Sequence, residues 1–272
     1  MDLRNVLRFF FIGAMLSLVL NTAFAQIDTQ PKPYGGKQLM KEFICDEMIY
    51  PDAAIKAKTE GIVKVGVTIM TNGKKTNYRI AESVSPELDN EALRICKLIM
   101  FYPAVKSSNN IIEDVVIPVK FNIKKYKRNC KQKGFDHYEG YAGTVDTSMI
   151  VYASKELAMM PRPEFKDPGM NFSKFIVENM KYPEIAFRQS ITGQVELSFI
   201  VETSGRISNI EIINALGGGC TEEAIHLLKQ ILWIPGIRKG IAVRSFMTAN
   251  INFSLDNNSE HKYLPNHNNA TM

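Results

Sequence analysis

The chain has 272 residues, of which 45% are hydrophobic and 22% charged, with 17 glycines and 12 prolines. This composition excludes collagen-like, low-complexity and wholly disordered chains, and the length indicates about two domains. Four cysteines are too few for a disulfide framework, and a net charge of +5 does not by itself indicate nucleic-acid binding.

The N-terminal segment over residues 1–25 has the pattern of a secretory signal peptide. Arg4 and Arg8 form a positive start, an apolar run over 9–20 follows, and an Ala-Phe-Ala sequence ends at Ala25. The apolar run is shorter than the ~20 residues that cross a bilayer comfortably, so we expect cleavage after Ala25. An uncleaved anchor, with both arginines on the cytoplasmic side, is the alternative. Export argues against DNA, RNA and ATP as partners.

The rest of the chain contains an internal repeat at an offset of 132 residues. Tyr50-Pro51 recurs as Tyr182-Pro183 without any gap in the alignment of the two copies. Further positions that keep their residue are Gly61 and Gly193, Gly73 and Gly205, Pro103 and Pro235, and Phe121 and Phe253. A repeat of this length indicates two copies of one domain rather than a solenoid, and we place them at 34–123 and 162–255.

Each copy begins with an amphipathic helix, which places apolar residues at helical spacing over 40–48 in copy one. The Tyr-Pro dipeptide ends this helix, because the residue before proline is driven out of the α region, and a short helix follows. Residues 63–69 and 195–201 alternate apolar and polar side chains, which predicts strands with one buried face. Gly73 and Gly205 predict hairpin turns into a returning strand.

A second helix and a last strand complete each copy. We expect the helix to begin at Asp89 or Thr221, both good N-caps, with Glu91 or Glu223 in the first turn against the helix dipole. The last strands are predicted over 115–123 and 247–255. The fold class is therefore α+β: two tandem domains, each a three-stranded antiparallel sheet with helices packed on one face.

Two segments lie outside the repeat. Residues 124–161 form a basic and polar linker, in which 124–133 is rich in Lys and Arg. A charge run of this kind is usually solvated, and attachment to an anionic envelope surface is the functional alternative. The stretch 149–152 is a candidate extra strand before copy two. Residues 256–272 lack apolar periodicity and predict a disordered tail.

The ordered motifs of the two copies resemble the TonB C-terminal domain family. Copy two carries Tyr182-Pro183-Glu184 and Trp233-Ile234-Pro235-Gly236, and copy one carries Ile117-Pro118-Val119-Lys120-Phe121. The motif positions filled in both copies are Tyr50, Pro51, Gly61, Gly73, Pro103 and Phe121, with Tyr182, Pro183, Gly193, Gly205, Pro235 and Phe253. The chain is thus identified as two tandem copies of this domain.

The resemblance implies a part in energy-coupled transport across the outer membrane. Energy transducers of the family have an uncleaved N-terminal helix that contacts a proton-driven motor through a Ser and a His, and a Pro-rich arm that crosses the periplasm. Here the apolar segment contains Ser17 but no histidine, and the arm is reduced to Pro31-Lys32-Pro33. The chain therefore resembles the receptor-binding end of a transducer without its motor-coupled part.

The resemblance also implies that the last strand is an open edge, which recruits a short receptor peptide by β-augmentation. In copy two this edge consists of Met247, Thr248, Ala249, Asn250, Ile251, Asn252 and Phe253. Pro118 in copy one has no N–H to donate, whereas Asn250 at the matching position restores a donor. Copy two is therefore expected to be the better peptide acceptor. Pairing of this strand with a sister molecule is the alternative.

We expect an exported binding module of the cell envelope, located in the periplasm and linked to TonB-dependent transport. Its expected partner is a TonB-dependent outer-membrane receptor or another envelope protein, with a homodimer as a further option. Nucleic acid is not expected, and membrane contact is expected only if the N-terminal segment is uncleaved. The alternatives are a periplasmic scaffold or dimerisation protein without receptor coupling, and an energy transducer anchored in the inner membrane and facing the periplasm.

The sequence contains no motif that predicts catalysis, so we expect no enzyme, no cofactor and no metal site. The histidines are scattered at His137, His226, His261 and His267, away from metal-ligand spacing. The cysteines Cys45, Cys96, Cys130 and Cys220 permit three complete pairings in an oxidising compartment, which the sequence leaves open. Trp233 is expected to fill the core beside the second helix of copy two.

Overall fold

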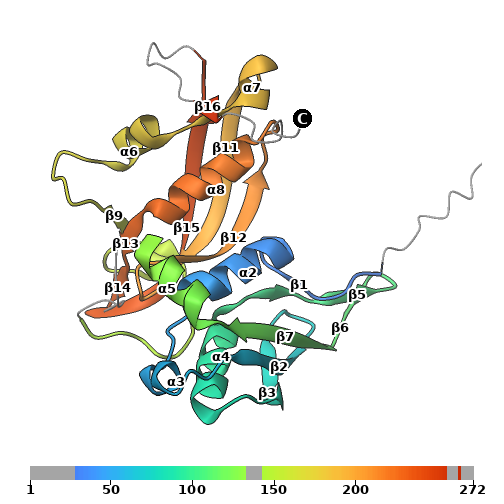
Figure 1. The fold of residues 1–272 in the computed structure, drawn as a ribbon. Coiled ribbons are helices and arrows are strands. Elements are labelled where there is room, and N and C mark those ends of the chain that lie inside the picture. Colours follow the sequence, from blue (N-terminus) through green and yellow to red (C-terminus); the bar gives the residue numbers. More distant parts are fainter. Residues whose placement is uncertain (1–27, 133–142, 256–262, 265–272) are drawn as a thin grey trace, which may run out of the picture.

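The computed structural model describes residues 28–132 and 143–255, together with the backbone of 263–264. The predicted signal segment 1–25 and most of the predicted tail 256–272 lie outside the described residues. Two bodies of mixed helix and sheet are stacked on each other, with the helix over 36–47 between them (Figure 1).

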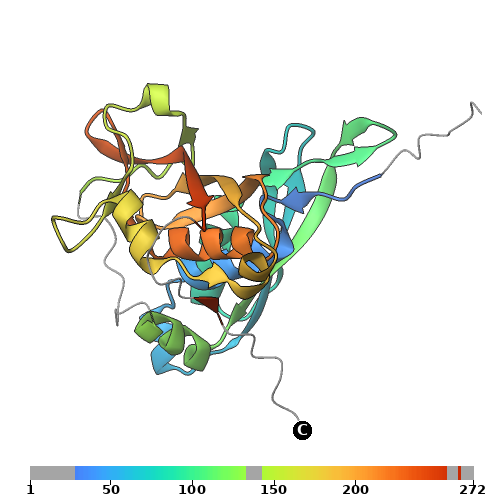
Figure 2. The same ribbon diagram turned by 90° about the horizontal axis from the view of Figure 1, so that it is seen from above.

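The first copy contains the elements that the periodicity predicts, in the predicted order. Its helices are α2 (Gly36–Glu47), α3 (Asp52–Lys56) and α4 (Pro86–Leu98). Its strands are β1 (Lys32–Pro33), β2 (Gly61–Ile69), β3 (Lys75–Glu82), β4 (Phe101–Tyr102), β5 (Ala104–Lys106), β6 (Asn109–Ile111) and β7 (Glu113–Phe121). The hairpin formed by β5 and β6 projects from the body (Figure 2).

The second copy repeats this order and adds to it. Its helices are α6 (Phe172–Asn179), α7 (Glu184–Arg188) and α8 (Cys220–Gln230), preceded by the 3-10 turn η1 (Ser154–Glu156). Its strands are β8 (Val151–Tyr152), β9 (Arg162–Glu164), β10 (Tyr182–Pro183), β11 (Gly193–Val201), β12 (Ile207–Asn214), β13 (Leu232–Ile234), β14 (Gly236–Arg238), β15 (Ile241–Phe253) and β16 (Tyr263–Leu264).

The sheets confirm the predicted topology. Copy one has the antiparallel order β3-β2-β7, and copy two has the equivalent order β12-β11-β15. The long pairings are in the same register, since Gly61 pairs with Phe121 and Gly193 with Phe253. The second sheet is larger than predicted, because β14 pairs antiparallel and β8 parallel with the first part of β15. The candidate strand at 149–152 is therefore present as β8.

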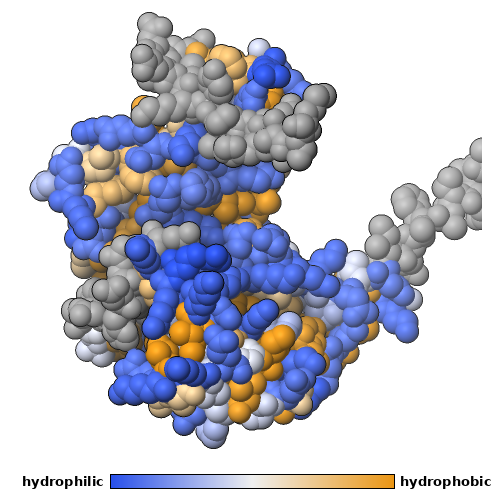
Figure 3. Space-filling view, viewed as in Figure 1, coloured by the Kyte–Doolittle hydropathy of each residue, from blue (hydrophilic) through white to orange (hydrophobic). Residues whose placement is uncertain are grey.

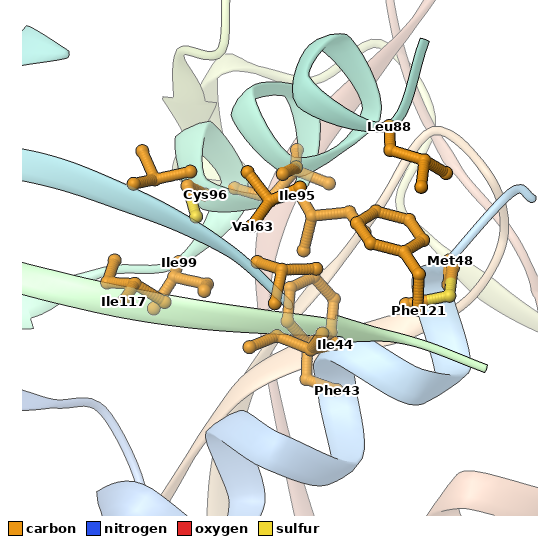
Figure 4. Close-up of a cluster of buried hydrophobic side chains, with 14 of the residues drawn as sticks. Phe43, Ile44, Met48, Val63, Leu88, Ile95, Cys96, Ile99, Ile117 and Phe121 are labelled. Carbon is orange, nitrogen blue, oxygen red and sulfur yellow. The ribbon is translucent and has the colours of Figure 1, made fainter. Parts of the chain in front are cut away.

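One apolar face of each sheet forms a core with the helices. In copy one, Val63 on β2, Ile117 on β7 and Ile95 on α4 are fully or almost fully buried (Figure 4). The Phe121 ring meets Tyr50 edge-on, with ring centroids 5.6 Å apart, and the Phe253 ring meets Tyr182 in the same way at 5.8 Å. The last strand of each copy thereby packs against the Tyr-Pro dipeptide that follows the first helix, which we call the Tyr-Pro corner.

Both second helices begin earlier than predicted. Ser85 caps α4 by accepting a hydrogen bond from the Leu88 amide, because Pro86 fixes the first turn. Asp89 accepts from the Val84 amide and the Ser83 hydroxyl instead, so it orders the preceding loop. In copy two, Gly219 occupies the cap position in a left-handed conformation, and Thr221 lies inside α8.

Glu223 lies in the first turn of α8, as predicted, whereas Glu91 lies beyond the first turn of α4, and both have a further role that was not predicted. Both are buried, and each carboxylate accepts a hydrogen bond of 2.7 Å from the amide just before a Tyr-Pro dipeptide, that of Ile49 or of Lys181. Burial is the largest influence on Glu223 and raises the pKa of its carboxyl. Each copy thus has a hydrogen bond from its second helix to the backbone just before the Tyr-Pro dipeptide, which the apolar pattern of the helix does not predict.

Two segments predicted to be irregular contain regular structure. Residues 124–132 of the predicted linker belong to α5 (Ile123–Gln132), because Ile123, Tyr126 and Cys130 form an apolar stripe that faces the first core. Within the predicted disordered tail, Tyr263–Leu264 form β16, which pairs in parallel with β10.

The two copies are joined through α2 and the end of α4. The Lys229 ammonium on α8 contacts the carboxylates of Glu42 at 2.8 Å and Asp46 at 3.1 Å on α2. The Asn209 side chain on β12 donates to the Leu98 carbonyl at 3.0 Å and accepts from the Met100 amide at 2.6 Å. The Asn209 contacts lie on β12, and α2 also packs against this strand, so the first copy covers that edge of the second sheet.

Candidate strand-binding edge

The four outer strands of the two sheets differ in regularity. Strands β3 and β12 are interrupted by register shifts, and each contains an asparagine in the left-handed region, Asn77 at φ 51 and Asn209 at φ 48. An irregular edge is a poor template for another strand. Strands β7 and β15 keep an unbroken register with their inner neighbours from Glu113 to Phe121 and from Ser245 to Phe253. The regular edges are therefore those of the last strands.

The outer side of β15 is divided into a used and an open part. The start of β15 is paired by β14 over 241–243, and its outer side is paired by β8 over 244–245. Among the strands that the structure describes, none pairs with that side from Phe246 to Phe253. All seven predicted edge residues, 247–253, lie in this part, and its length suits a short extended segment.

The direction of the edge amides follows from the repeat. Pro118 pairs with Lys64 in copy one, and Asn250 pairs with Glu196 at the equivalent position of copy two. A proline is tolerated in a strand where its nitrogen faces away from the neighbouring strand. By the shared register, the Asn250 amide faces the open side, and so do those of Thr248 and Asn252, two residues away on each side. The open edge thus has a donor at Asn250 that copy one lacks at Pro118.

The two faces of the open edge differ in polarity. Ala249, Ile251 and Phe253 are buried on the side of the core, whereas Thr248, Asn250 and Asn252 are exposed. The alternation confirms the strand and its predicted buried face. In a segment that pairs here, successive side chains would point to opposite faces of the sheet. One set would lie on the side of the core helices, and the other set would lie beside the polar, uncharged side chains of Thr248, Asn250 and Asn252.

The start of β15 is held by a buried ion pair that sequence reasoning missed. The Arg244 guanidinium donates to the Glu202 carboxylate at 2.6 and 2.9 Å, and both side chains are almost fully buried. Arg244 also donates to the carbonyls of Leu98 at 2.9 Å and Met149 at 2.9 Å. The strand that carries the open edge is therefore fastened to the first copy at its base. The only sequence signal was a charged residue inside each of two apolar runs.

The end of α4 is contacted by a second cation, Lys75. The Lys75 ammonium donates to the carbonyls of Cys96 at 3.0 Å and Lys97 at 2.8 Å in the last turn of the helix, and to that of Ile99 just after it, where positive charge is favourable. Burial, with a contribution from the Arg244 charge, lowers the pKa of Lys75 to about 7. The buried thiol of Cys96 has a pKa raised to about 12, chiefly by burial.

We expect the free energy of unfolding to rise as the pH is raised from about 7 to about 8.5. The unfolded chain binds the Lys75 proton up to a pKa of about 10.4, so over this range it holds more protons than the folded chain, and the slope is at most ~1.4 kcal/mol per pH unit. Above about 8.5 the Cys96 thiol, which ionises first in the unfolded chain, opposes the rise. Urea unfolding at both pH values measures the effect. If the free energy of unfolding of Lys75→Met depended on pH as strongly as that of the unmodified chain, the assignment of the effect to Lys75 would be wrong.

The remaining predicted positions have structural roles. Tyr50 and Tyr182 each donate a hydroxyl hydrogen bond of 2.6 Å, to the carbonyls of Thr59 and Ile191. Gly73 and Gly205 make the hairpin turns at φ 76 and 77. The other motif positions also lie where the motif predicts: Pro51 and Pro183 precede α3 and α7, Gly61 and Gly193 open β2 and β11, and Pro103 and Pro235 separate β4 from β5 and β13 from β14.

The cysteines form no disulfide, and Trp233 lies in the core. Cys45, Cys96, Cys130 and Cys220 are free thiols, so none of the pairings left open by the sequence is present. Trp233 is 3% exposed and packs against Phe199, as expected for a core residue. Within 28–132 and 143–255, no three His, Cys, Asp or Glu side chains are grouped to hold a metal ion. No helix in the described ranges has the length and hydropathy needed to span a membrane.

Comparison with known proteins identifies the repeated unit. The family model described as Gram-negative bacterial TonB protein C-terminal matches twice, over 46–123 and 178–255. The solution structure of the TonB C-terminal domain of Helicobacter pylori is 23% identical and matches 32% of this chain and 78% of its own, with a TM-score of 0.26. No curated protein matches the chain. The family matches cover both Tyr-Pro corners and both last strands.

Proposed function

This chain belongs to the TonB C-terminal domain family, and we propose that it is an exported binding module of the periplasm that takes a receptor peptide on the open edge of β15. The family is one of non-enzymatic, energy-coupling transport domains that interact with outer-membrane receptors. Its partner here would be the periplasmic peptide of a TonB-dependent receptor. Binding would occur by β-augmentation, in which main-chain hydrogen bonds supply affinity and side-chain sites supply selectivity.

The observation that carries the proposal is the regular, unpaired outer side of β15 from Phe246 to Phe253. The base of the strand is fixed by the Arg244–Glu202 pair, so the edge is ordered before a peptide arrives and less entropy is lost on binding. The competing edge of β12 is irregular and lies against the first copy. The edge of β7 lacks a donor at Pro118.

The proposal predicts that Asn250→Pro weakens peptide binding and Asn250→Ala does not. Proline removes one outward-facing donor and leaves the pairing with β11 intact, as Pro118 does in copy one. The loss of one net hydrogen bond corresponds to about a 2- to 12-fold weaker Kd. The measurement is a titration of the labelled chain with synthetic peptides from the periplasmic segments of the TonB-dependent receptors of the same organism.

The matched control is Pro118→Asn, which restores a donor to copy one and is expected to add a second, weaker site. Equal weakening by Asn250→Ala and Asn250→Pro would show that the side chain is recognised instead of the backbone. Peptide-induced amide shifts confined to copy one would refute the choice of edge. Concentration-dependent self-association that Asn250→Pro abolishes, without any peptide binding, would favour the scaffold or dimerisation alternative.

Export is tested separately by the mass of the mature chain. We expect a mature chain that begins at Gln26, as cleavage after Ala25 would produce. A chain that retains Met1 in the membrane fraction would instead favour the anchored energy transducer. This measurement does not depend on the peptide titration, so the two parts of the proposal can fail independently.

A further inference from the structure

The solvent-facing side of α5 presents five cations. Lys124, Lys125, Lys127, Arg128 and Lys131 are all exposed, and the helix that carries them is only ten residues long. Figure 3 shows strongly hydrophilic side chains gathered where Figure 1 places α5. None of the five forms an ion pair with a carboxylate among the residues that the structure describes. The helix thus forms a concentrated positive surface, which we call the basic face of α5.

The opposite side of α5 holds this surface in place. Ile123 and Tyr126 pack against the first core, Cys130 is 8% exposed, and the Tyr126 ring lies 5.4 Å from that of Tyr50. The Asn122 side chain caps the helix by accepting from the Lys125 amide at 2.8 Å. The basic face is therefore part of a fixed helix attached to a domain, and its charges do not move as a flexible tail would.

The charges are unfavourable for the helix itself. Lys124 and Lys125 lie in the first turn, where the helix dipole disfavours cations. Lys124 with Arg128 and Lys127 with Lys131 are like-charge pairs four residues apart, which oppose helix formation. The packing of α5 against the first core requires only its apolar stripe and none of these cations. Four of the five cations, Lys124, Lys125, Arg128 and Lys131, lie within one arc opposite that stripe, so they can face a single flat surface together.

We propose that the basic face of α5 binds the surface of an anionic phospholipid bilayer. Charge complementarity selects this occupant, since clustered Lys and Arg on an amphipathic helix are attracted by the negative potential of anionic headgroups. This contact goes beyond peptide binding and would hold the domain at a membrane without a spanning segment.

The test is co-sedimentation of the whole chain with vesicles of phosphatidylcholine alone and of phosphatidylcholine with about one-third phosphatidylglycerol. The ratio of the two binding constants removes the apolar contribution of the N-terminal segment, and the charges of Arg4 and Arg8 are the same in every variant. We expect a ratio well above one that falls steeply with added salt. The variant Lys124→Gln, Lys125→Gln, Arg128→Gln, Lys131→Gln is expected to lower the ratio by several hundredfold, since each cation near the surface contributes roughly fivefold.

The matched control neutralises four exposed cations elsewhere: Lys106→Gln, Lys155→Gln, Lys166→Gln, Lys239→Gln. Both variants have the same net charge, and glutamine keeps the helix propensity of lysine, so a thermal melt should show α5 intact. Equal loss in both variants would overturn the proposal in favour of net charge alone. A ratio near one for the unmodified chain would also overturn it, as would salt-sensitive binding to duplex DNA without binding to vesicles.

Discussion

Replacing Arg244 by isoleucine is expected to lower the free energy of unfolding by about 3–5 kcal/mol, because it leaves the buried Glu202 carboxylate without its cation. Glu202 is 1% exposed, and its remaining partner is the Ser208 hydroxyl, so water cannot replace the guanidinium. The loss also removes the hydrogen bonds to Leu98 and Met149. Urea unfolding at neutral pH, followed by Trp233 fluorescence, measures the change.

The first copy supplies the control for this prediction. At the positions equivalent to Glu202 and Arg244 it has Met70 and Ile112, so the repeated unit folds in copy one without this ion pair. The double variant Glu202→Met, Arg244→Ile is expected to recover most of the lost stability, because no unpaired charge is left buried. A double variant as unstable as Arg244→Ile would show that the contacts with Leu98 and Met149, rather than the ion pair, stabilise this region.

Gly35→Ala is expected to separate the two copies. Gly35 has φ 69, and a Cβ built there would overlap the carbonyl oxygen of Ile210 on β12. Backbone oxygen cannot move aside without moving the strand, so α2 would have to shift from the second sheet. We expect a loss of about 2–5 kcal/mol, which combines left-handed backbone strain with overpacking. A larger radius of gyration in X-ray scattering would report the separation.

Gly36→Ala is the matched control. Gly36 has φ 84, but a Cβ there would meet no atom within 4 Å, so this variant reports the backbone strain alone. We expect it to cost about 1–2 kcal/mol and to leave the radius of gyration unchanged. If both variants had equal effects, Gly35 would serve only the start of α2, and the contact with Ile210 would not determine how the copies are stacked.

Local patterns account for the parts of the fold that were predicted correctly. Strict alternation predicted β2 and β11, since a strand with one buried face has a period of two. The helix starts were wrong because Asp89 and Thr221 are as suitable for caps as Ser85 and Gly219, but their side chains form hydrogen bonds with the preceding loop instead. The linker prediction missed α5 because its cations hid a stripe of three apolar residues.

The sequence alone determined that this protein carries one α+β domain twice, with the same order of helices and strands in each copy. That information is local and repeated: periodicity within each element, turn glycines, and a proline that only an edge strand accommodates. The tertiary structure decided which edge stays free and how the copies are joined. Arg244 meets Leu98, and Asn209 meets Met100, across more than a hundred residues. Such contacts leave no periodic signal, because they depend on where two finished domains touch.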